Sequence, residues 1–238
     1  MKDFFERHGF SVGRDEFFDL LRDQQLLIRR RQSRKPRTTF SSHWLRKYPN
    51  LLVNLLIDRP HQVWVSDITY IVVGNGFAYL FLLTDAYSRK IIGYAVEGSL
   101  GTEGATKALK MALSQKPAAA KTIHHSDRGV QYCSYDYVDR LNKSKMSISM
   151  TQNSDPRENA IAERVNGILK QELLQKSYAT LADAQAHLPK VISIYNVERP
   201  HLSLDFLTAP AARTLGSTQS GRGVKATVGK LPLQVLKS

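Results

Sequence analysis

Apolar residues along the chain change their spacing, and these changes predict where strands and helices lie. Between about residues 60 and 98, three runs rich in β-branched and aromatic residues alternate with short polar connections: VWVSDITYIVV, FAYLFLLTDA and KIIGYAVEG. Such runs predict three strands joined in hairpins. The spacing then becomes helical in TEGATKALKMALSQ and YDYVDRLNKS, with strand-like TIHHSD and SISMT among them. Two further helices are predicted at about 156–176 and 181–196.

This order of elements predicts an α/β fold. Three hairpin-connected strands followed by alternating helices and strands are typical of a five-stranded mixed sheet flanked by helices. A small helical segment precedes it, because RDEFFDLLRDQQLL places Phe17, Phe18, Leu21 and Leu26 on one face. We therefore expect a helical, basic N-terminal segment over 1–45 and a core over 55–211. The basic stretch 212–238, rich in Gly, Ser and Thr, is expected to be a flexible tail.

Three carboxylates, in separate predicted elements, are candidates for a common site. Asp67 lies within an apolar strand, Asp127 where a short strand stops at Asp-Arg-Gly, and Glu163 on a predicted helix 35 residues further on. An ionised Asp inside an apolar strand is costly unless it is paired. Three such groups could converge on divalent cations, and their oxygen ligands suit Mg²⁺ or Mn²⁺. Two such ions can clamp the attacking and leaving oxygens of a phosphoryl displacement.

The helix that carries Glu163 has a polar stripe at intervals of four, three and four residues: Asn159, Glu163, Asn166 and Lys170. Asp155 and Pro156 suit the start of this helix, and Glu158 has the capping-box spacing, which explains Glu158 structurally. The stripe is either a solvated surface or the wall of a cleft that Asp67 and Asp127 share. In the second case Lys170 could reach a phosphate.

Other candidates have both a functional and a structural interpretation. Asp85 could be a fourth ligand, but its position beside Arg89 favours a structural pair. His125 lies on the same strand face as Asp127 and could approach the site, whereas His124 is expected to pack. Trp64 is expected to face the opposite side of its strand from Asp67 and to lie in the core. In YNVERPH, Arg199 could contact DNA or only stabilise the turn.

Charge indicates the class of partner. The net charge is +13 and the pI about 9.9, which favours a polyanion, and nucleic acid rather than a membrane surface. A dense basic run over 29–37 is either a solvated linker or a set of phosphate contacts. Its candidate contacts are Arg29, Arg30, Arg31, Lys35 and Arg37.

Two absences in the sequence exclude other classes of protein. The single cysteine, Cys133, excludes an internal disulfide framework and a zinc site built on several cysteines. No apolar stretch is long enough to span a bilayer, and the N-terminus lacks a signal-peptide layout. We therefore expect a cytoplasmic protein.

The segments WVSDITY, HHSDRGVQY, ENAIAERVNGILK and YNVERPH, in this order, resemble the transposases of the IS-three family of bacterial insertion sequences. These are relatives of retroviral integrases with a ribonuclease-H-like core. The resemblance covers about residues 38–210. It implies that Asp67, Asp127 and Glu163 form a DDE catalytic triad and that Lys170 is the basic residue seven positions after the glutamate.

The resemblance also implies a function and partners. The chain would be a second-frame product and a DDE polynucleotidyl transferase that uses two Mg²⁺ or Mn²⁺ ions. It would cleave DNA at the element's inverted repeats and join it to target DNA, as a homo-oligomer, associated with the bacterial nucleoid. The upstream-frame product or a frameshift fusion would assist. Two alternatives stay open: a ribonuclease-H-like nuclease without joining activity, and a DNA-binding remnant, because the N-terminal segment is shorter than the family's helix-turn-helix region.

Overall fold

The computed structural model describes residues 9, 13–24, 43–152, 156–201, 204, 207–209 and 211. The chain divides into two compact units, Met1–Lys35 and Pro36–Ser238. In the first unit, helix α2 (Arg14–Asp23) forms within the predicted helical segment, with Phe17 buried and Phe18 exposed. The basic run 29–37, Leu26 and the tail 212–238 lie outside the described residues.

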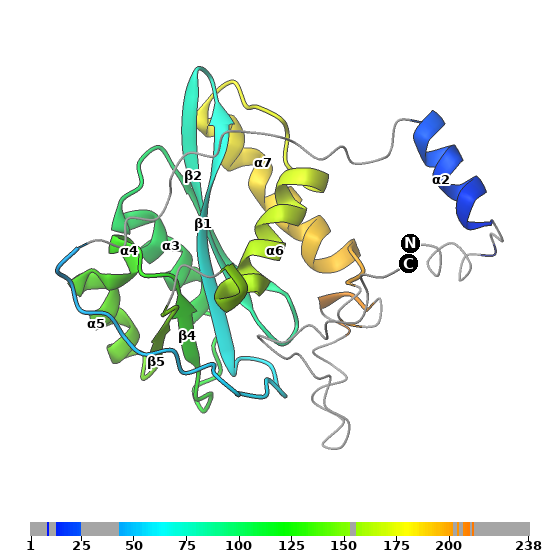
Figure 1. Ribbon diagram of the computed structural model, residues 1–238. Helices are drawn as coiled ribbons and strands as arrows, with labels where there is room; N and C mark the ends of the chain where they lie inside the picture. The colour runs from blue at the N-terminus through cyan, green and yellow to red at the C-terminus, as the bar shows by residue number, and fades with distance from the viewer. Residues whose placement is uncertain are drawn as a thin grey trace. The chain divides into compact units, whose positions relative to one another are not determined.

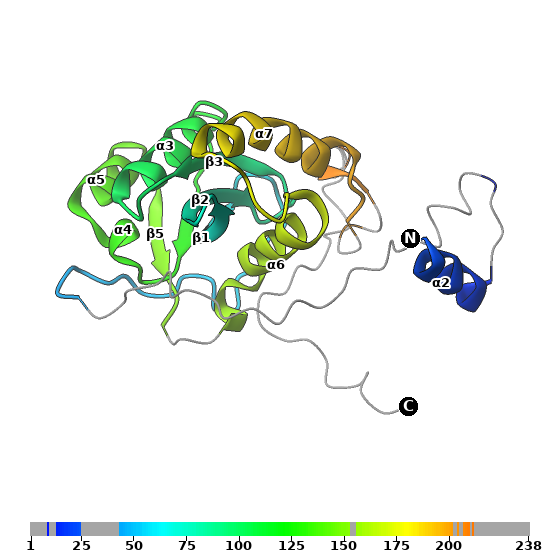
Figure 2. The same ribbon diagram turned by 90° about the horizontal axis from the view of Figure 1, so that it is seen from above.

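The second unit contains the predicted five-stranded mixed sheet (Figures 1 and 2). Its strands are β1 (Val63–Val73), β2 (Gly76–Asp85), β3 (Ile91–Glu97), β4 (Ile123–Ser126) and β5 (Ser147–Met150). They lie in the order β3-β2-β1-β4-β5. The β1–β2 and β2–β3 pairs are antiparallel, and the β1–β4 and β4–β5 pairs are parallel. The long central strand β1 therefore pairs with β2 on one side and with the short β4 on the other.

Helices cover both faces of this sheet. On one face lie α3 (Thr102–Leu113), α4 (Val130–Cys133) and α5 (Tyr135–Lys143), and on the other α6 (Ala160–Ile168) and α7 (Leu181–Ser193) (Figure 1). Helix α4 was not predicted, because four residues are too few for a helical period. A 3₁₀ turn, η1 (Pro156–Asn159), precedes α6, and π-helical turns η2 (Leu169–Leu173) and η3 (Ile194–Glu198) extend α6 and α7.

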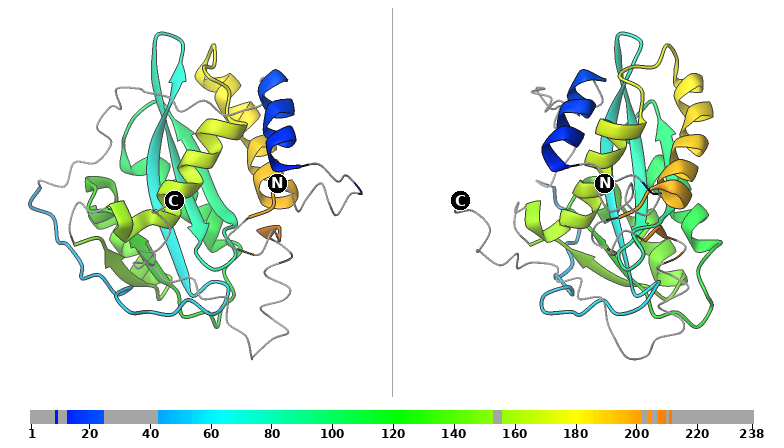
Figure 3. Two further views of the ribbon diagram at one scale, coloured as in Figure 1. Left: turned by 45° about the vertical axis from the view of Figure 1, so that its right-hand side comes forward. Right: turned by 90° about the vertical axis from the view of Figure 1, so that its right-hand side faces the viewer.

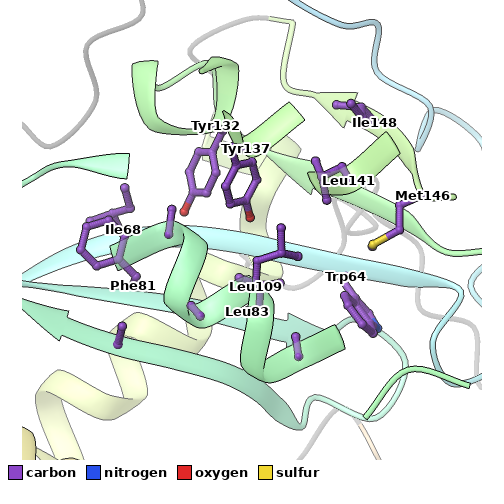
Figure 4. Packing of buried hydrophobic residues seen from close by; sticks show 14 of the residues in the cluster. Trp64, Ile68, Phe81, Leu83, Leu109, Tyr132, Tyr137, Leu141, Met146 and Ile148 are labelled. Carbon is purple, nitrogen blue, oxygen red and sulfur yellow. The ribbon is translucent and has the colours of Figure 1, made fainter. Parts of the chain in front are cut away.

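The alternation of side chains along β1 places a separate apolar core on each face. Trp64 and Ile68 pack with α3, α4 and α5, and Figure 4 shows Tyr132, Tyr137 and Leu109 close to them. Trp64 is fully buried, as predicted. On the other face β1 and β2 pack against Val165, Ile168 and Leu169, the apolar side of the helix predicted at 156–176. Because both faces of β1 are covered, a carboxylate on this strand lies among apolar neighbours.

Close packing of α3 against the sheet depends on a glycine. A Cβ atom at Gly93 on β3 would overlap the backbone carbonyl of Ala108 on α3. The backbones of the helix and the strand therefore approach more closely here than a side chain would allow. Among the described residues, the structure contains no helix that is both long enough and apolar enough to cross a membrane.

Candidate active site

The register of the sheet places Asp67 beside Asp127. In the parallel pairing of β1 with β4, Val65 lies opposite His125. Asp67 and Asp127 each follow two residues later, so both side chains lie at the same end of neighbouring strands and on the same face. Asp127 comes directly after the last residue of β4, Ser126, as the sequence predicted.

Asp67 is held by two hydrogen bonds and is surrounded by negative charge. Its Oδ1 accepts the backbone N–H of Ile68 at 2.9 Å, and its Oδ2 accepts Asn166 Nδ2 at 2.7 Å. Burial, above all, raises the pKa of Asp67 to about 7, and the charge of Asp127 adds to this increase. The two hydrogen bonds lower the pKa, and Glu163 raises it slightly. The charges of both other predicted carboxylates, Asp127 and Glu163, therefore act on Asp67 in the folded chain.

Asp127 begins a tight turn. Its Oδ1 accepts the backbone N–H of Gly129 at 2.9 Å. A Cβ atom at position 129 would lie 2.9 Å from the same carboxylate oxygen, so a side chain there would displace the carboxylate. The Asp-Arg-Gly segment that ends the strand in the sequence thus orients the carboxylate of Asp127.

The two asparagines of the polar stripe contact β1. Asn159 Nδ2 donates to the carbonyl of Ser66 at 3.0 Å, and Asn166 contacts Asp67. Lys170, on the π-helical turn after α6, places its Nζ 3.7 Å from the centre of the Tyr70 ring. Figure 3 shows the yellow-green α6 crossing the cyan strand β1. Glu163, which is exposed, lies on this same stripe, and its charge acts on Asp67. The stripe therefore lies beside Asp67, with Asn159 and Asn166 against β1 and Glu163 exposed to solvent.

The start of this helix differs from the prediction. Its first turn is the 3₁₀ turn η1, and the α-helix begins only at Ala160 with Asn159 as its N-cap residue. Asp155 lies outside the described residues. Glu158 Oε2 accepts the backbone N–H of Gln152 at 2.6 Å, which agrees with a structural role for Glu158.

His125 joins three segments around the site. Its Nε2 donates to the carbonyl of Glu158 at 3.0 Å, because a carbonyl oxygen can only accept. Its Nδ1 lies 2.8 Å from Ser149 Oγ, and that hydroxyl oxygen also accepts the Leu51 N–H at 2.9 Å. His125 is fully buried. Both ring nitrogens therefore contact protein atoms, and His125 holds the turn that leads to Glu163.

His124 packs, as predicted, within a polar network on the opposite face. Its Nε2 lies 2.9 Å from the hydroxyl oxygen of Tyr137 and 2.7 Å from Ser66 Oγ, within hydrogen-bond distance of both. Burial, and to a smaller extent His125, lowers the pKa of His124 to about 3. The imidazole is therefore neutral, and it hydrogen-bonds to the strand that carries Asp67 through Ser66.

Two other candidates have structural partners. Asp85 is buried, and its carboxylate accepts the hydroxyl of Ser88 at 2.7 Å and the N–H of His61 at 3.2 Å. Arg199 forms a bidentate ion pair with Glu172, at 2.7 Å from Nε and 2.9 Å from Nη2. Because this pair occupies the Arg199 guanidinium, the geometry favours the turn-stabilising interpretation, and its contact with DNA stays a prediction.

The residues around Asp67 have the donor chemistry that a hard divalent cation requires. Carboxylate oxygens come from three elements, and the buried Oδ1 of Asn166 has no hydrogen-bond partner among the described residues. Within the same residues, no three His, Cys, Asp or Glu side chains lie close enough together to hold one ion. Mutual repulsion acts on these carboxylates, and a cation between them would remove it. The residues therefore fit a divalent ion in the chemistry of their donor atoms.

Sequence reasoning placed Asn166 on the polar stripe but missed its partner. The signal was its spacing, three residues after Glu163 and four before Lys170, which puts all three on one helix face. The five basic candidates between Arg29 and Arg37 lie outside the described residues, and their contacts with DNA stay a prediction.

The fold and this arrangement define the class of the protein: an integrase-type catalytic core. The structure resembles the catalytic core domain of HTLV-2 integrase, solved in complex with magnesium, with a TM-score of 0.51 and 17% identity. The match covers 65% of this chain and 97% of that domain. It also resembles the core of BIV integrase, with a TM-score of 0.51 and 13% identity, over 66% of this chain and 97% of that one. At these identities the likeness is one of fold.

Sequence comparison identifies the family. Two family models, each described as "Integrase core domain", match residues 57–156 and 144–208. A 31 kDa protein of insertion element IS600 from Shigella sonnei is 38% identical over 87% of this chain and 76% of its own length. The chain belongs to the integrase core family of insertion-sequence transposases.

Two named transposases are also similar. The transposase for insertion sequence element IS629 from Shigella sonnei is 32% identical over 71% of this chain. Transposase InsF for insertion sequence IS3A from Escherichia coli K12 is 34% identical over 62% of this chain. The matched regions cover 57% and 52% of these two relatives, so this chain spans little more than half the length of either.

Proposed function

We propose that this chain is the catalytic subunit of a DNA transposase that hydrolyses a phosphodiester at the element end and joins the resulting 3′-hydroxyl to target DNA. One observation carries the proposal. Asp67, Asp127 and Glu163 come from β1, from the end of β4 and from α6, and the charges of Asp127 and Glu163 both act on Asp67. Membership of the integrase core family supports the same chemistry.

In this proposal Asp67, Asp127 and Glu163 are the DDE triad and hold two Mg²⁺ or Mn²⁺ ions. Divalent cations bound there stabilise the attacking and leaving oxygens of a phosphoryl displacement. Asn166 orients Asp67, while Asn159 and His125 hold the start of the helix against β1 and β4. These are positioning residues.

DNA is the proposed partner, and several basic residues would hold its phosphates. Lys170 lies on the same stripe as Glu163 and would contact a phosphate near the reacting bond. The basic run 29–37 and Arg199 would add contacts away from it. A net charge of +13 supports a polyanionic partner.

Assembly on DNA as a homo-oligomer is part of the proposal. It is supported by two neighbours in fold, the HTLV-2 integrase core in a dimeric form and the simian T-cell lymphotropic virus integrase in an intasome. Assistance from an upstream-frame product, and association with the nucleoid, stay predictions.

A strand-transfer assay on labelled DNA tests this function. Oligonucleotides that end in the element's inverted repeat are incubated with the protein in Mg²⁺ or in EDTA, beside Asp67→Asn and Glu163→Gln. Glu103→Gln is the charge-matched control, because Glu103 is an exposed residue of α3, on the opposite face of the sheet. We expect joined products that require the metal, persist in the control and vanish in both site variants.

The other outcomes separate the alternatives. Cleavage without joining would identify a nuclease. DNA binding without either product would identify a binding remnant. Loss of DNA binding in Asp67→Asn to the same degree as loss of joining would show that Asp67 is structural.

A further inference from the structure

An exposed aromatic pair lies next to the candidate active site. Trp44 is 80% exposed and Tyr135 is 70% exposed, more than any other large apolar side chain in the described part of the chain. Their ring centres are 6.0 Å apart and the rings are tilted by 53°. Aromatic rings of this size are normally buried, because each removes a large apolar area from water. Two of them together in solvent therefore suggest a surface made for a ligand.

The backbone that presents Trp44 is fixed to the core. Leu45 and Tyr48 pack against the core on the α3–α5 face, whereas the neighbouring Trp44 is exposed. His43 Nε2 donates to the carbonyl of Arg128 at 2.8 Å, and the carbonyl of Pro49 accepts the N–H of Met150 at 3.3 Å. Figure 1 shows this light-blue segment running past α5 and β5. Trp44 is thus held in a defined place rather than on a loose loop.

The pair is tied directly to the candidate catalytic loop. Arg128, to which His43 is bonded, follows Asp127, and the short helix α4 leads from there to Tyr135 at the start of α5. A strand of DNA whose reacting phosphate lies at Asp127 would therefore reach the two rings by passing over Arg128.

Positive charge surrounds the rings on the side of this loop. Arg46, Lys47 and Arg128 form no ion pair with any carboxylate among the described residues, and Arg128 Nε is buried there without a hydrogen-bond partner. The charges of Lys47, Arg128 and Asp127 all act on the thiol of Cys133, the last residue of α4. Asp136 follows Tyr135 in the first turn of α5.

These features match the way in which proteins bind unpaired nucleotides. Aromatic faces stack on bases, and neighbouring basic residues neutralise the backbone. A duplex hides the faces of its bases, so only nucleotides outside a duplex can use two exposed rings.

We propose that Trp44 and Tyr135, with Arg46, Lys47 and Arg128, form a binding site for unpaired nucleotides of DNA next to the catalytic carboxylates. The proposal rests on the transposase function proposed above, since it takes DNA as the substrate. The unpaired nucleotides can belong to the element end or to the target, and both present the same stacked base and phosphate.

Intrinsic fluorescence tests the site directly. The chain has two tryptophans, and Trp64 is fully buried, so Trp44 is the one that a stacked base can reach. The full chain is titrated in EDTA with a single-stranded thymidine oligonucleotide and with a duplex of equal length. We expect quenching by the single strand that exceeds quenching by the duplex and disappears in Trp44→Phe. Equal quenching by both, or none, would overturn the proposal.

Affinity measured by anisotropy of a labelled oligonucleotide gives the second readout. Trp44→Ala and Tyr135→Ala should each weaken single-strand binding about 5- to 100-fold. Trp44→Phe and Tyr135→Phe should bind nearly as the parent does, because they keep a ring. Met111→Ala, which removes another exposed apolar side chain from α3, is the matched control. Equal affinity of Trp44→Ala and the Met111→Ala control would overturn the proposal.

A strand-transfer assay distinguishes the source of the nucleotides and separates the two proposals. Unpaired bases are placed either on the element-end duplex or on the target duplex, and the substrate whose joining drops in Trp44→Ala is the one bound at the rings. If the parent protein joins DNA and Trp44→Ala joins each of the two substrates as well as the parent does, the proposal of an aromatic site is wrong and the transposase function stands. If the parent shows selective quenching but never joins DNA, the site stands and the transposase function is wrong.

Discussion

The hydrogen bond between Asn166 and Asp67 is the contact on which the geometry of the candidate site depends most. Asn166 is buried on α6 and donates to the Oδ2 of Asp67 at 2.7 Å. This bond fixes one oxygen of the carboxylate and leaves its remaining lone pairs for a cation. When a residue that hydrogen-bonds to a metal-binding side chain is mutated, metal affinity or activity commonly falls by about 10- to 100-fold.

We therefore expect Asn166→Ala to raise the Mg²⁺ concentration for half-maximal strand transfer by about tenfold. The measurement is a metal titration of the joining reaction. Asn142→Ala, which truncates an exposed asparagine on α5, is the control and should behave as the parent. An unchanged half-maximal concentration in Asn166→Ala would mean that other contacts hold Asp67.

His124 makes the stability of the fold depend on pH. Burial, with a contribution from His125, lowers its pKa to about 3, whereas an unfolded histidine has a pKa of about 6.5. Below about pH 6.5 this histidine is therefore protonated in the unfolded chain, whereas in the folded chain it stays neutral down to about pH 3. The free energy of unfolding falls over this window, by about 2 kcal/mol between pH 7 and pH 5.

Urea denaturation at pH 7 and pH 5 measures this loss. In His124→Gln the side chain does not titrate and can still hydrogen-bond to the Tyr137 hydroxyl, so the free energy of unfolding of this variant should fall less between the two pH values. Burial also lowers the pKa values of His125 and His201. These two histidines are present in both proteins, so their contribution to the pH dependence is common to both. The same fall in both proteins would show that His124 does not contribute.

At the scale of elements, the packing of α3 on β3 depends on Gly93. A Cβ atom there would overlap the Ala108 carbonyl of the helix backbone, which cannot move aside as a flexible side chain does. We expect Gly93→Ala to lower the free energy of unfolding by about 1–3 kcal/mol. Chemical denaturation measures it.

Gly167 provides a matched control for the same substitution. It lies within α6, and a Cβ atom there would meet no other atom within 4 Å. Gly167→Ala should leave stability unchanged or raise it by up to about 1 kcal/mol, because alanine favours a helix interior. Equal effects of the two substitutions would contradict the close approach of α3.

The ion pair of Arg199 with Glu172 connects the two π-helical turns that end the α6 and α7 segments. Both side chains are partly exposed, 20% for Arg199 and 27% for Glu172, so solvent weakens their attraction. Its bidentate geometry still favours a measurable coupling, and we expect about 0.5–1 kcal/mol in a double-mutant cycle of Arg199→Ala and Glu172→Ala. If Arg199→Ala instead weakens DNA binding and leaves stability unchanged, its main role is contact with DNA.

Other residues of the YNVERPH segment are also structural. Asn196 accepts the N–H of Ile91 and donates to its carbonyl, both at 2.9 Å, and so binds the backbone where the edge strand β3 begins. Tyr195 is fully buried. Asn196 therefore ties the segment after α7 to the edge of the sheet.

At the scale of the whole molecule, the candidate catalytic residues come from the sheet and from one helix that packs on it. The sheet brings together residues from positions 67 and 127, and α6 adds residues 159–170. The second unit thus provides the chemistry, in agreement with the family models that match residues 57–208 within it.

The sequence by itself determined the type and order of the elements and singled out Asp67, Asp127 and Glu163 as candidates. The five strands, the helices at 102–113 and 135–143, and the positions of Asp67 within β1 and Asp127 after β4 agree with prediction. These features are encoded locally, because alternation and helical spacing reflect which faces of a single element are buried. The carboxylates were recognisable because an ionised group in an apolar run is costly.

Only the tertiary structure decided which of these residues meet. The polar stripe of α6 could have faced solvent throughout, but the packing of Val165 and Ile168 on the sheet brings Asn159 and Asn166 into contact with β1. Trp44 and Tyr135 are far apart in the sequence and carry no periodic signal that links them. Glu172 lies 27 positions before Arg199, and only the fold shows that the two form an ion pair. Contacts of this kind depend on the register of strands and the crossing of helices, which bring distant positions together and which a local pattern does not encode.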